Sequence, residues 1–143
     1  MGYGLDDEDW NDFNGVDLTG KVAMMLRGVP EGRRARSSGT KARTALEKGA
    51  IGVVFAGPSG PGRATLPPLT RGQGLPNGTD LVGVGISKEA FEAMTGMKFD
   101  EARAAKVPAS KLLSLQAKLI TETEPNTGKA INIIGYLPGR DPY

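Results

Sequence analysis

The sequence predicts a mixed α/β domain built from short strands and two or three short helices. Two observations lead to this fold class. Short apolar segments rich in β-branched residues alternate with segments whose apolar residues recur at helical spacing, and turn residues separate most of them. The chain has 143 residues, including 21 glycines and 10 prolines. This composition favours short elements joined by turns, and the length suits one domain with its own core.

The first half of the sequence predicts a strand, a helix and a second strand. Residues 20–28, GKVAMMLRG, are bounded by glycines, and apolar side chains occupy both alternating sets of positions. We therefore expect a strand that is partly buried on both faces. A helix is expected over residues 40–49, with Thr40 as its N-cap and Gly49 in the left-handed conformation that ends it. The apolar run at 50–57 then predicts a buried strand.

A long segment without periodicity follows. Residues 57–78 are rich in proline and glycine, and loops of this length in compact domains are commonly functional or mobile. After this loop, residues 81–87 predict another strand. Ser87 is expected to cap a helix over residues 88–96, which ends at a glycine.

The C-terminal third carries three further expectations. A short helix is expected over residues 100–106. Apolar and polar residues alternate through 113–119, which predicts a half-buried strand. The β-branched run at 131–137 predicts a last strand.

The chain contains no histidine and no cysteine. It therefore lacks the ordinary neutral-pH general base, any Ser-His or Cys-His pair, and the imidazole and thiolate ligands of most zinc sites. We expect no catalytic residue, no metal site and no cofactor in this chain. No apolar run approaches the roughly 20 residues that a membrane-spanning helix needs, so no membrane span is expected.

Charge is unevenly distributed, although the formal net charge is only +2. Residues 6–12, DDEDWND, predict a solvated acidic loop. A basic segment further on is expected on a solvated surface loop, where it can attract an acidic ligand or an acidic surface of the same parent protein. Nucleic acid is not expected as a partner, because no aromatic residue for base stacking occurs between Val16 and Val54. The basic residues are Arg33, Arg34, Arg36, Lys41 and Arg43.

Two motifs come close to known sites without completing them. Ser38 and Lys41 have the S-x-x-K spacing in which lysine activates serine in penicillin-recognising enzymes, but the accompanying S-D-N and K-T-G motifs are absent. These two residues are interpreted as flanking a helix start. The glycine-rich pieces GVGISK and GQGLPNG are interpreted as turns, because neither completes the fingerprint of a nucleotide site.

Three segments, taken in order, resemble the protease-associated (PA) domain family. Residues 12–21 carry the pattern Asp-Phe-x-Gly-x-Asp-x-x-Gly-Lys, which in that family leads into the first core strand. Residues 41–50 are similar to its Lys-x-x-x-Ala and Gly-Ala positions before an apolar strand, and residues 81–96 to its strand, Ile-Ser pair and helix. The resemblance covers almost the whole chain outside the long loop. It implies a β/β/α sandwich or open barrel with two to three short flanking helices.

The end of the sequence narrows the resemblance. Residues 132–141 are similar to the Asn-Val-Ile-Gly-x-Leu-Pro-Gly-x-Asp run that begins the catalytic domain of secreted zinc-dependent aminopeptidases, relatives of transferrin receptor and glutamate carboxypeptidase. This implies a PA domain over residues 1–128 and the start of a missing peptidase catalytic domain, as linker or first strand, over residues 129–143. Zinc would belong to that missing domain. The parent would be secreted or periplasmic, with its signal segment outside this sequence.

The resemblance implies a non-catalytic module that covers or flanks the active-site cleft of a metallo-aminopeptidase. There it would select substrates or mediate protein interaction, with the parent's catalytic domain and peptide or protein substrates as partners. The alternative is a different host, a subtilisin-like protease or a sorting receptor, in which the domain binds peptides or proteins. Because loops on a rigid scaffold carry recognition, the candidate contact residues are Arg63, Leu66, Leu69, Arg71 and Leu75 of the long loop.

Overall fold

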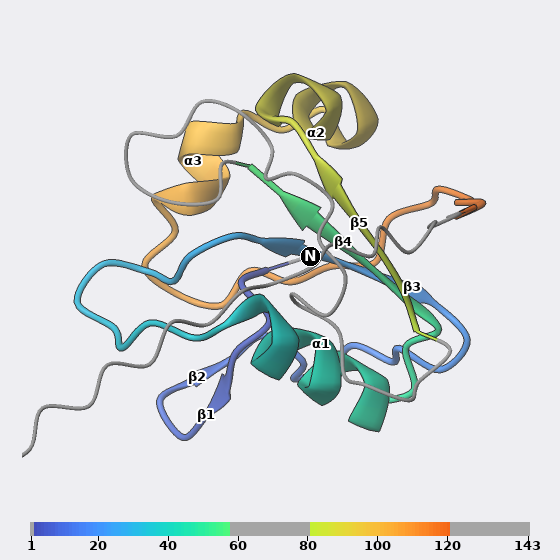
Figure 1. Ribbon diagram of the computed structural model, residues 1–143. Coiled ribbons are helices and arrows are strands. Elements are labelled where there is room, and N and C mark those ends of the chain that lie inside the picture. The colour runs from blue at the N-terminus through green and yellow to red at the C-terminus, as the bar shows by residue number, and fades with distance from the viewer. Residues whose placement is uncertain (1, 58–80, 121–143) are drawn as a thin grey trace, which may run out of the picture.

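A computed structural model describes residues 2–57 and 81–120 of the chain. The described residues form three layers, with one helix on one face of a central sheet and two shorter helices on the other face (Figure 1). The predicted mixed α/β class is confirmed, and the described strands form two separate sheets without a closed barrel. The elements are β1 (Asp6–Asp7), β2 (Trp10–Asn11), β3 (Val22–Leu26), α1 (Ser38–Glu47), β4 (Gly52–Ala56), β5 (Val82–Ile86), α2 (Lys88–Thr95) and α3 (Phe99–Arg103).

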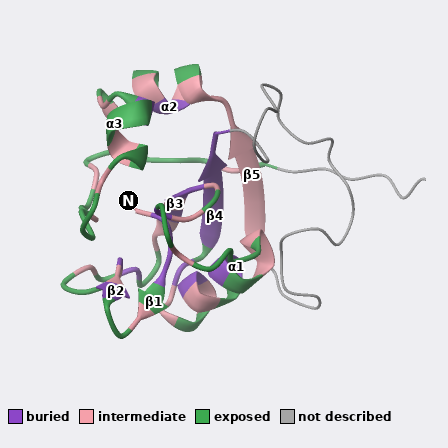
Figure 2. Ribbon diagram, turned by 90° about the vertical axis from the view of Figure 1, so that its left-hand side faces the viewer, coloured by how far each residue is buried: buried purple, intermediate pink, exposed green. Residues whose placement is uncertain are grey.

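The central sheet has three parallel strands in the order β3-β4-β5. The register pairs Val22 with Gly52 and Gly52 with Val82, so the three strands begin and end level with one another. All five residues of β4 are buried, and Figure 2 shows this strand between its less buried neighbours. A central parallel strand is covered on both faces, which explains its uninterrupted apolar sequence. The three strands predicted around residues 20–28, 50–57 and 81–87 are therefore confirmed.

Each face of the sheet has its own core. On the face covered by α1, the buried residues include Met25, Ala42, Ala45, Val53 and Phe55. On the opposite face, the rings of Phe91 and Phe99 meet edge to face, with centroids 5.4 Å apart and planes at 84°. The two rings are 0% and 2% exposed, and burying each contributes about 2 kcal/mol to stability. They fasten α2 and α3 to the sheet.

The helix caps lie where the sequence predicted them, except at the N-terminus of α1. Ser87 caps α2 by accepting a hydrogen bond from the backbone N of Ala90, and Gly96 ends this helix in the left-handed conformation at φ 67°. For α1, however, the predicted cap Thr40 is wrong. The cap is Ser37, whose side chain accepts from the backbone N of Thr40 at 3.0 Å. The helix thus starts earlier, because the serine satisfies a free amide of the first turn.

The junction between α1 and β4 depends on a glycine. Gly49 has φ +91° and follows the C-cap of α1, as predicted. A Cβ atom at this position would lie 3.1 Å from the backbone Cα of Thr19. Only glycine combines this backbone conformation with such a close approach, so the helix can return directly into the central strand.

Two C-terminal expectations change in the structure. Residues 113–119 form no strand and pair with neither described sheet. Leu112, Leu115 and Ile120 are 58%, 52% and 76% exposed. The expected helix at 100–106 is present but shorter and earlier, as α3. The expected strand at 131–137 lies outside the described residues. None of the helices in residues 2–57 and 81–120 is long and apolar enough to cross a membrane.

The Gly49 junction can be tested by adding one methyl group. Gly49→Ala should lower the free energy of unfolding by about 2 kcal/mol or more, because backbone strain and the contact with Thr19 add together. Gly15→Ala is the matched control, since Gly15 also has positive φ but nothing lies within 4 Å of its Cβ position. Urea unfolding of both variants measures the difference. Equal losses for the two variants would show that the close approach to Thr19 is unimportant.

Candidate functional site

The carboxyl ends of β3, β4 and β5 meet at one edge of the sheet. Here we use the name carboxyl edge for the residues that follow these strands, namely Arg27, Gly28, Gly57 and Ser87. Backbone hydrogen bonds extend the sheet to this point, from Arg27 N to Ala56 O and from Gly57 N to Ile86 O, both at 3.0 Å. In parallel α/β sheets ligands bind outside the carboxyl ends of the strands. In the sequence, the Pro/Gly-rich segment follows directly after Gly57 and lies outside the described residues.

A buried lysine holds the carboxyl edge to α1. Lys41 is only 2% exposed, and its Nζ donates hydrogen bonds to the carbonyl oxygens of Leu26, at 3.1 Å, and Gly28. These carbonyls flank Arg27, so one ammonium group anchors the end of β3 and the turn after it. The expectation that Lys41 lies on a solvated surface loop is wrong. Its helical position turns the side chain toward the sheet, where main-chain carbonyls replace water as its partners.

Burial alters the protonation of this lysine. The pKa of Lys41 is lowered from 10.5 to about 8, mainly by desolvation; the charge of Asp12 opposes this shift and the charge of Arg27 adds to it. The ammonium also lies 5.6 Å from the ring centroid of Tyr3. A cation over an aromatic face gains electrostatic stabilisation. The Lys41 ammonium therefore holds two main-chain carbonyls, although its burial disfavours the protonated form.

Arg27 has an unusual environment at the same edge. Its guanidinium carbon lies 5.4 Å from the ring centroid of Phe55. Its Nε is buried and has no hydrogen-bond acceptor, and no ion pair joins Arg27 to a carboxylate of residues 2–57 or 81–120. Burial without such a partner lowers the pKa of Arg27. The sequence did not point to Arg27 as a site residue, because it falls inside the apolar strand predicted over residues 20–28.

A shallow hollow of about 330 Å³ lies between the turn after β3 and helix α3. The hydroxyl of Tyr3 donates to the carbonyl oxygen of Arg103 at 2.6 Å and joins the N-terminal segment to α3. Burial raises the pKa of Tyr3, so its hydroxyl remains a donor at neutral pH. The hollow is lined by Tyr3, Val29, Glu31, Asp100, Arg103 and Ala104.

The acidic segment is partly a folded hairpin, not a solvated loop. Strands β1 and β2 pair antiparallel, and Trp10 and Asp12 are each 4% exposed. The carboxylate of Asp12 accepts from the backbone N of Leu5 at 3.1 Å, while its own backbone N donates to Leu5 O at 2.8 Å. This pair of bonds fixes the hairpin base. The prediction of a solvated acidic loop is therefore wrong for these two residues.

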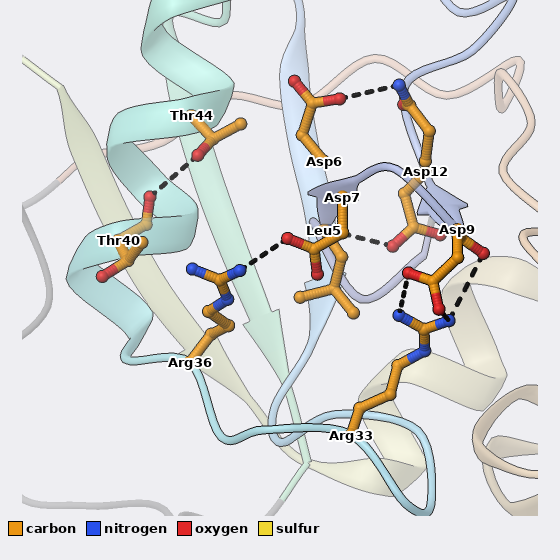
Figure 3. Close-up of polar contacts among 10 residues, drawn as sticks. Leu5, Asp6, Asp7, Asp9, Asp12, Arg33, Arg36, Thr40 and Thr44 are labelled. Atoms are coloured by element: carbon orange, nitrogen blue, oxygen red, sulfur yellow. Dashed lines mark hydrogen bonds and ion pairs between the residues drawn. The ribbon is translucent and has the colours of Figure 1, made fainter.

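The hairpin and the basic segment bind each other (Figure 3). Arg33 donates from both terminal nitrogens to Asp9, at 2.9 and 2.8 Å, and Arg36 donates to Asp7 at 2.5 Å. The hydrogen bonds within the first pair lower the pKa of Asp9 and raise that of Arg33. Lys48 adds a third ion pair, to Asp6 at 2.7 Å. Three cations that could have formed a basic ligand-binding surface, Arg33, Arg36 and Lys48, are therefore paired with carboxylates of the same chain.

The hairpin also borders a second hollow, of about 430 Å³. The described residues contain no group of three or more His, Cys, Asp or Glu side chains that could hold a metal ion. The hollow is lined by Glu8, Asp9, Trp10, Asn11, Asp12, Asn14, Pro108 and Ser110.

The structure does not join Ser38 and Lys41 as a nucleophile and base. Ser38 is the first residue of α1, whereas the Lys41 ammonium is committed to two main-chain carbonyls. An amine that donates to carbonyls in the core is not available to take a proton from a serine near the helix start. The expected contact residues Arg63, Leu66, Leu69, Arg71 and Leu75 lie outside the described residues, so their role stays a prediction.

Comparison with protein families matches residues 2–94 to the PA domain. The match contains the acidic hairpin, all three strands of the central sheet, Arg27 and Lys41. Comparisons with curated proteins and with solved structures give no match.

The buried Lys41 makes stability depend on pH. Its pKa is about 8 in the folded chain against an ordinary value of 10.5, so between these values the unfolded chain binds more protons. Stability should therefore rise with pH across this window, by at most about 1.4 kcal/mol per pH unit. The cost of the buried charge is fully present below pH 8 and is gone above 10.5. Lys41→Met should lose this rise, as measured by urea unfolding at several pH values.

Arg43→Met is the control, because Arg43 is an exposed residue of the same helix. It removes a cation without changing the buried group, so its pH dependence should follow that of the original chain. The same rise with pH in Lys41→Met would show that another group causes it.

The contact between Arg33 and the hairpin can be followed through Trp10, the only tryptophan of the chain. The Arg33 guanidinium lies 5.0 Å from the Trp10 ring centroid while it binds Asp9. Arg33→Met should therefore increase quenching of Trp10 fluorescence by acrylamide. Arg34→Met, which changes an exposed neighbour, should leave quenching unchanged. Equal quenching in both variants would contradict a covering role for Arg33.

Proposed function

This chain belongs to the protease-associated (PA) domain family, and on that premise we propose that it is the PA domain of a secreted or periplasmic zinc-dependent aminopeptidase. A PA domain is generally a protease-associated module and is not itself catalytic. In this role the chain covers or flanks the active-site cleft of its host and selects the peptides that reach it. Its partners are then the host's catalytic domain and peptide or protein substrates, and zinc belongs to the catalytic domain.

The observation that carries the proposed host is the run at residues 132–141, NIIGYLPGRD. It follows the PA-matched residues and resembles the start of the catalytic domain in zinc-dependent aminopeptidases. The absence of histidine and cysteine from this chain agrees with the proposed host, because the imidazole ligands of the zinc ion would come from the host's catalytic domain.

The carboxyl edge supports a role in substrate selection. It combines a rigid parallel sheet, a guanidinium without a carboxylate partner among the described residues and, next in the sequence, the Pro/Gly-rich segment. A rigid scaffold that presents variable loops and a few polar groups is the usual design of a recognition surface. The candidate contact residues Arg63, Leu66, Leu69, Arg71 and Leu75 follow this edge in the sequence and are part of the proposal.

A second host class rests on the same family membership. A subtilisin-like protease or a sorting receptor would use the domain as a peptide- or protein-binding module, with the same carboxyl edge as its scaffold. Neither host accounts for the run at 132–141. The coding sequence that follows Tyr143 separates the two proposals. An early His-x-Asp motif supports the aminopeptidase, and its absence supports the other hosts.

The proposed division between module and catalyst makes a direct prediction. The purified chain with added Zn²⁺ should release no p-nitroaniline from leucine p-nitroanilide above the buffer rate, because it has no His or Cys and its described residues hold no cluster of metal ligands. Ser38→Ala should behave identically, since Ser38 has no catalytic role. Zinc-dependent hydrolysis by the purified chain, abolished by a chelator, would overturn the proposal.

A further inference from the structure

We infer that Arg27, supported by the ring of Phe55, is a binding site for a peptide carboxylate at the carboxyl edge. The inference rests on the proposed function in peptide selection and names the chemical group that is selected. Arg27 follows the last residue of β3, and its guanidinium carbon lies 5.4 Å from the Phe55 ring centroid. Phe55 belongs to β4, and the backbone N of Arg27 donates to Ala56 O of the same strand, so the ligand would meet a group that the sheet holds in place.

The hydrogen-bonding state of Arg27 indicates that an acceptor belongs there. A guanidinium carries five N–H donors in a planar fork, and a buried donor without an acceptor is costly to keep. The Nε of Arg27 is such a donor. The Nε itself is closed to solvent, whereas the residue as a whole is partly exposed, so we expect the ligand to bind the terminal nitrogens next to the Nε–H. A carboxylate, with two oxygens in one plane, matches the fork and can accept two parallel hydrogen bonds.

The charges around Arg27 favour the same ligand. Lys41 lies close enough for the Arg27 charge to act on it, so two cations share a partly desolvated region. Asp12 acts on Lys41 in the opposite direction to Arg27, but its carboxylate also accepts from the backbone N of Leu5. The acidic residues Asp9, Asp7 and Asp6 are paired with Arg33, Arg36 and Lys48. An incoming carboxylate would reduce the repulsion between the two cations. It would also stabilise the charged form of Lys41.

The aromatic support favours a flat monoanion over a phosphate. Phe55 holds the guanidinium over its ring face, which leaves the edge of the fork as the binding surface. Phosphate sites in proteins usually gather several backbone N–H donors at a helix N-terminus or nest. Here the recognition element is one supported guanidinium. Such a carboxylate can come from an aspartate or glutamate side chain or from the C-terminus of a peptide.

The experiment follows the Arg27 Nε–H resonance of the ¹⁵N-labelled chain during titration with two pairs of probes. The first pair is N-acetyl-glutamate N-methylamide and its neutral glutamine analogue. The second pair is N-acetylglycine, with a free carboxylate, and its N-methylamide. An acidic probe should shift the resonance in a saturable way, while its neutral analogue should not. The first pair reports a side-chain carboxylate and the second a terminal one.

Variants separate a binding role from a structural one. Because the Arg27 variants lack the Nε–H, their binding is followed through the backbone amide resonance of Gly28. Arg27→Met should weaken binding of the effective probe by about tenfold or more, the usual effect of losing a hydrogen bond to a charged group. Arg27→Lys keeps the cation but loses the fork, so it should also bind more weakly. Arg43→Met removes an exposed cation of α1 and should bind as the original chain does. Binding of the probe should also raise the pKa of Lys41, followed through its side-chain resonances, in the original chain and in Arg43→Met but not in Arg27→Met.

The outcomes are distinct. A shift with neither acidic probe, an equal shift with the neutral analogues, or unchanged affinity in folded Arg27→Lys would overturn the carboxylate site. If neutral peptides still bind elsewhere on the chain, the proposed role in peptide selection survives that failure. If zinc-dependent hydrolysis is found instead, the proposed function fails independently of Arg27.

Discussion

The fold depends on a lysine ammonium that is buried where charge is costly. Lys41 reaches from α1 across the sheet face to the carbonyls of Leu26 and Gly28. The side chain of Lys41 thereby connects helix α1 both to the end of β3 and to the turn that follows it. Because the ammonium satisfies carbonyls on both sides of Arg27, it also fixes the position from which Arg27 is presented. Desolvation is offset only in part by these bonds and by the ring of Tyr3.

Around this anchor, opposite charges of the chain are largely matched with each other. The acidic hairpin meets the basic segment through Arg33 and Arg36, and Lys48 closes the set from the end of α1. Exposed pairs of this kind add little stability individually. Their effect here is positional, since they bring the hairpin with its buried Trp10 against the connection between β3 and α1. Arg27 differs from them in lacking a carboxylate among the described residues.

The elements with strong local signals were predictable. The strands around β3, β4 and β5, the Ser87 cap and the left-handed Gly49 and Gly96 depend on residues close in sequence, and each appears in the structure. The alternation at residues 113–119 failed, because a strand also needs a neighbour and a pattern cannot supply one. The two-residue strands of the hairpin were not predicted, because they lie in an acidic segment and acidic residues are normally solvated. The candidate site at Arg27 was not predicted, because a residue within a predicted apolar strand is expected to contribute to packing.

By itself, the sequence determined the mixed α/β class, the order of the main elements, the glycine junction and the family. It also excluded imidazole and thiolate chemistry, since the chain has neither residue. Only the tertiary structure decided which charges are buried, which are paired and which lack a partner. Backbone preferences arise from each residue and its neighbours along the chain. Desolvation and ion pairing arise from residues brought together in space, such as Lys41 with Leu26 and Arg33 with Asp9. The same lysine, arginine and aspartate residues therefore acquired different roles only after folding.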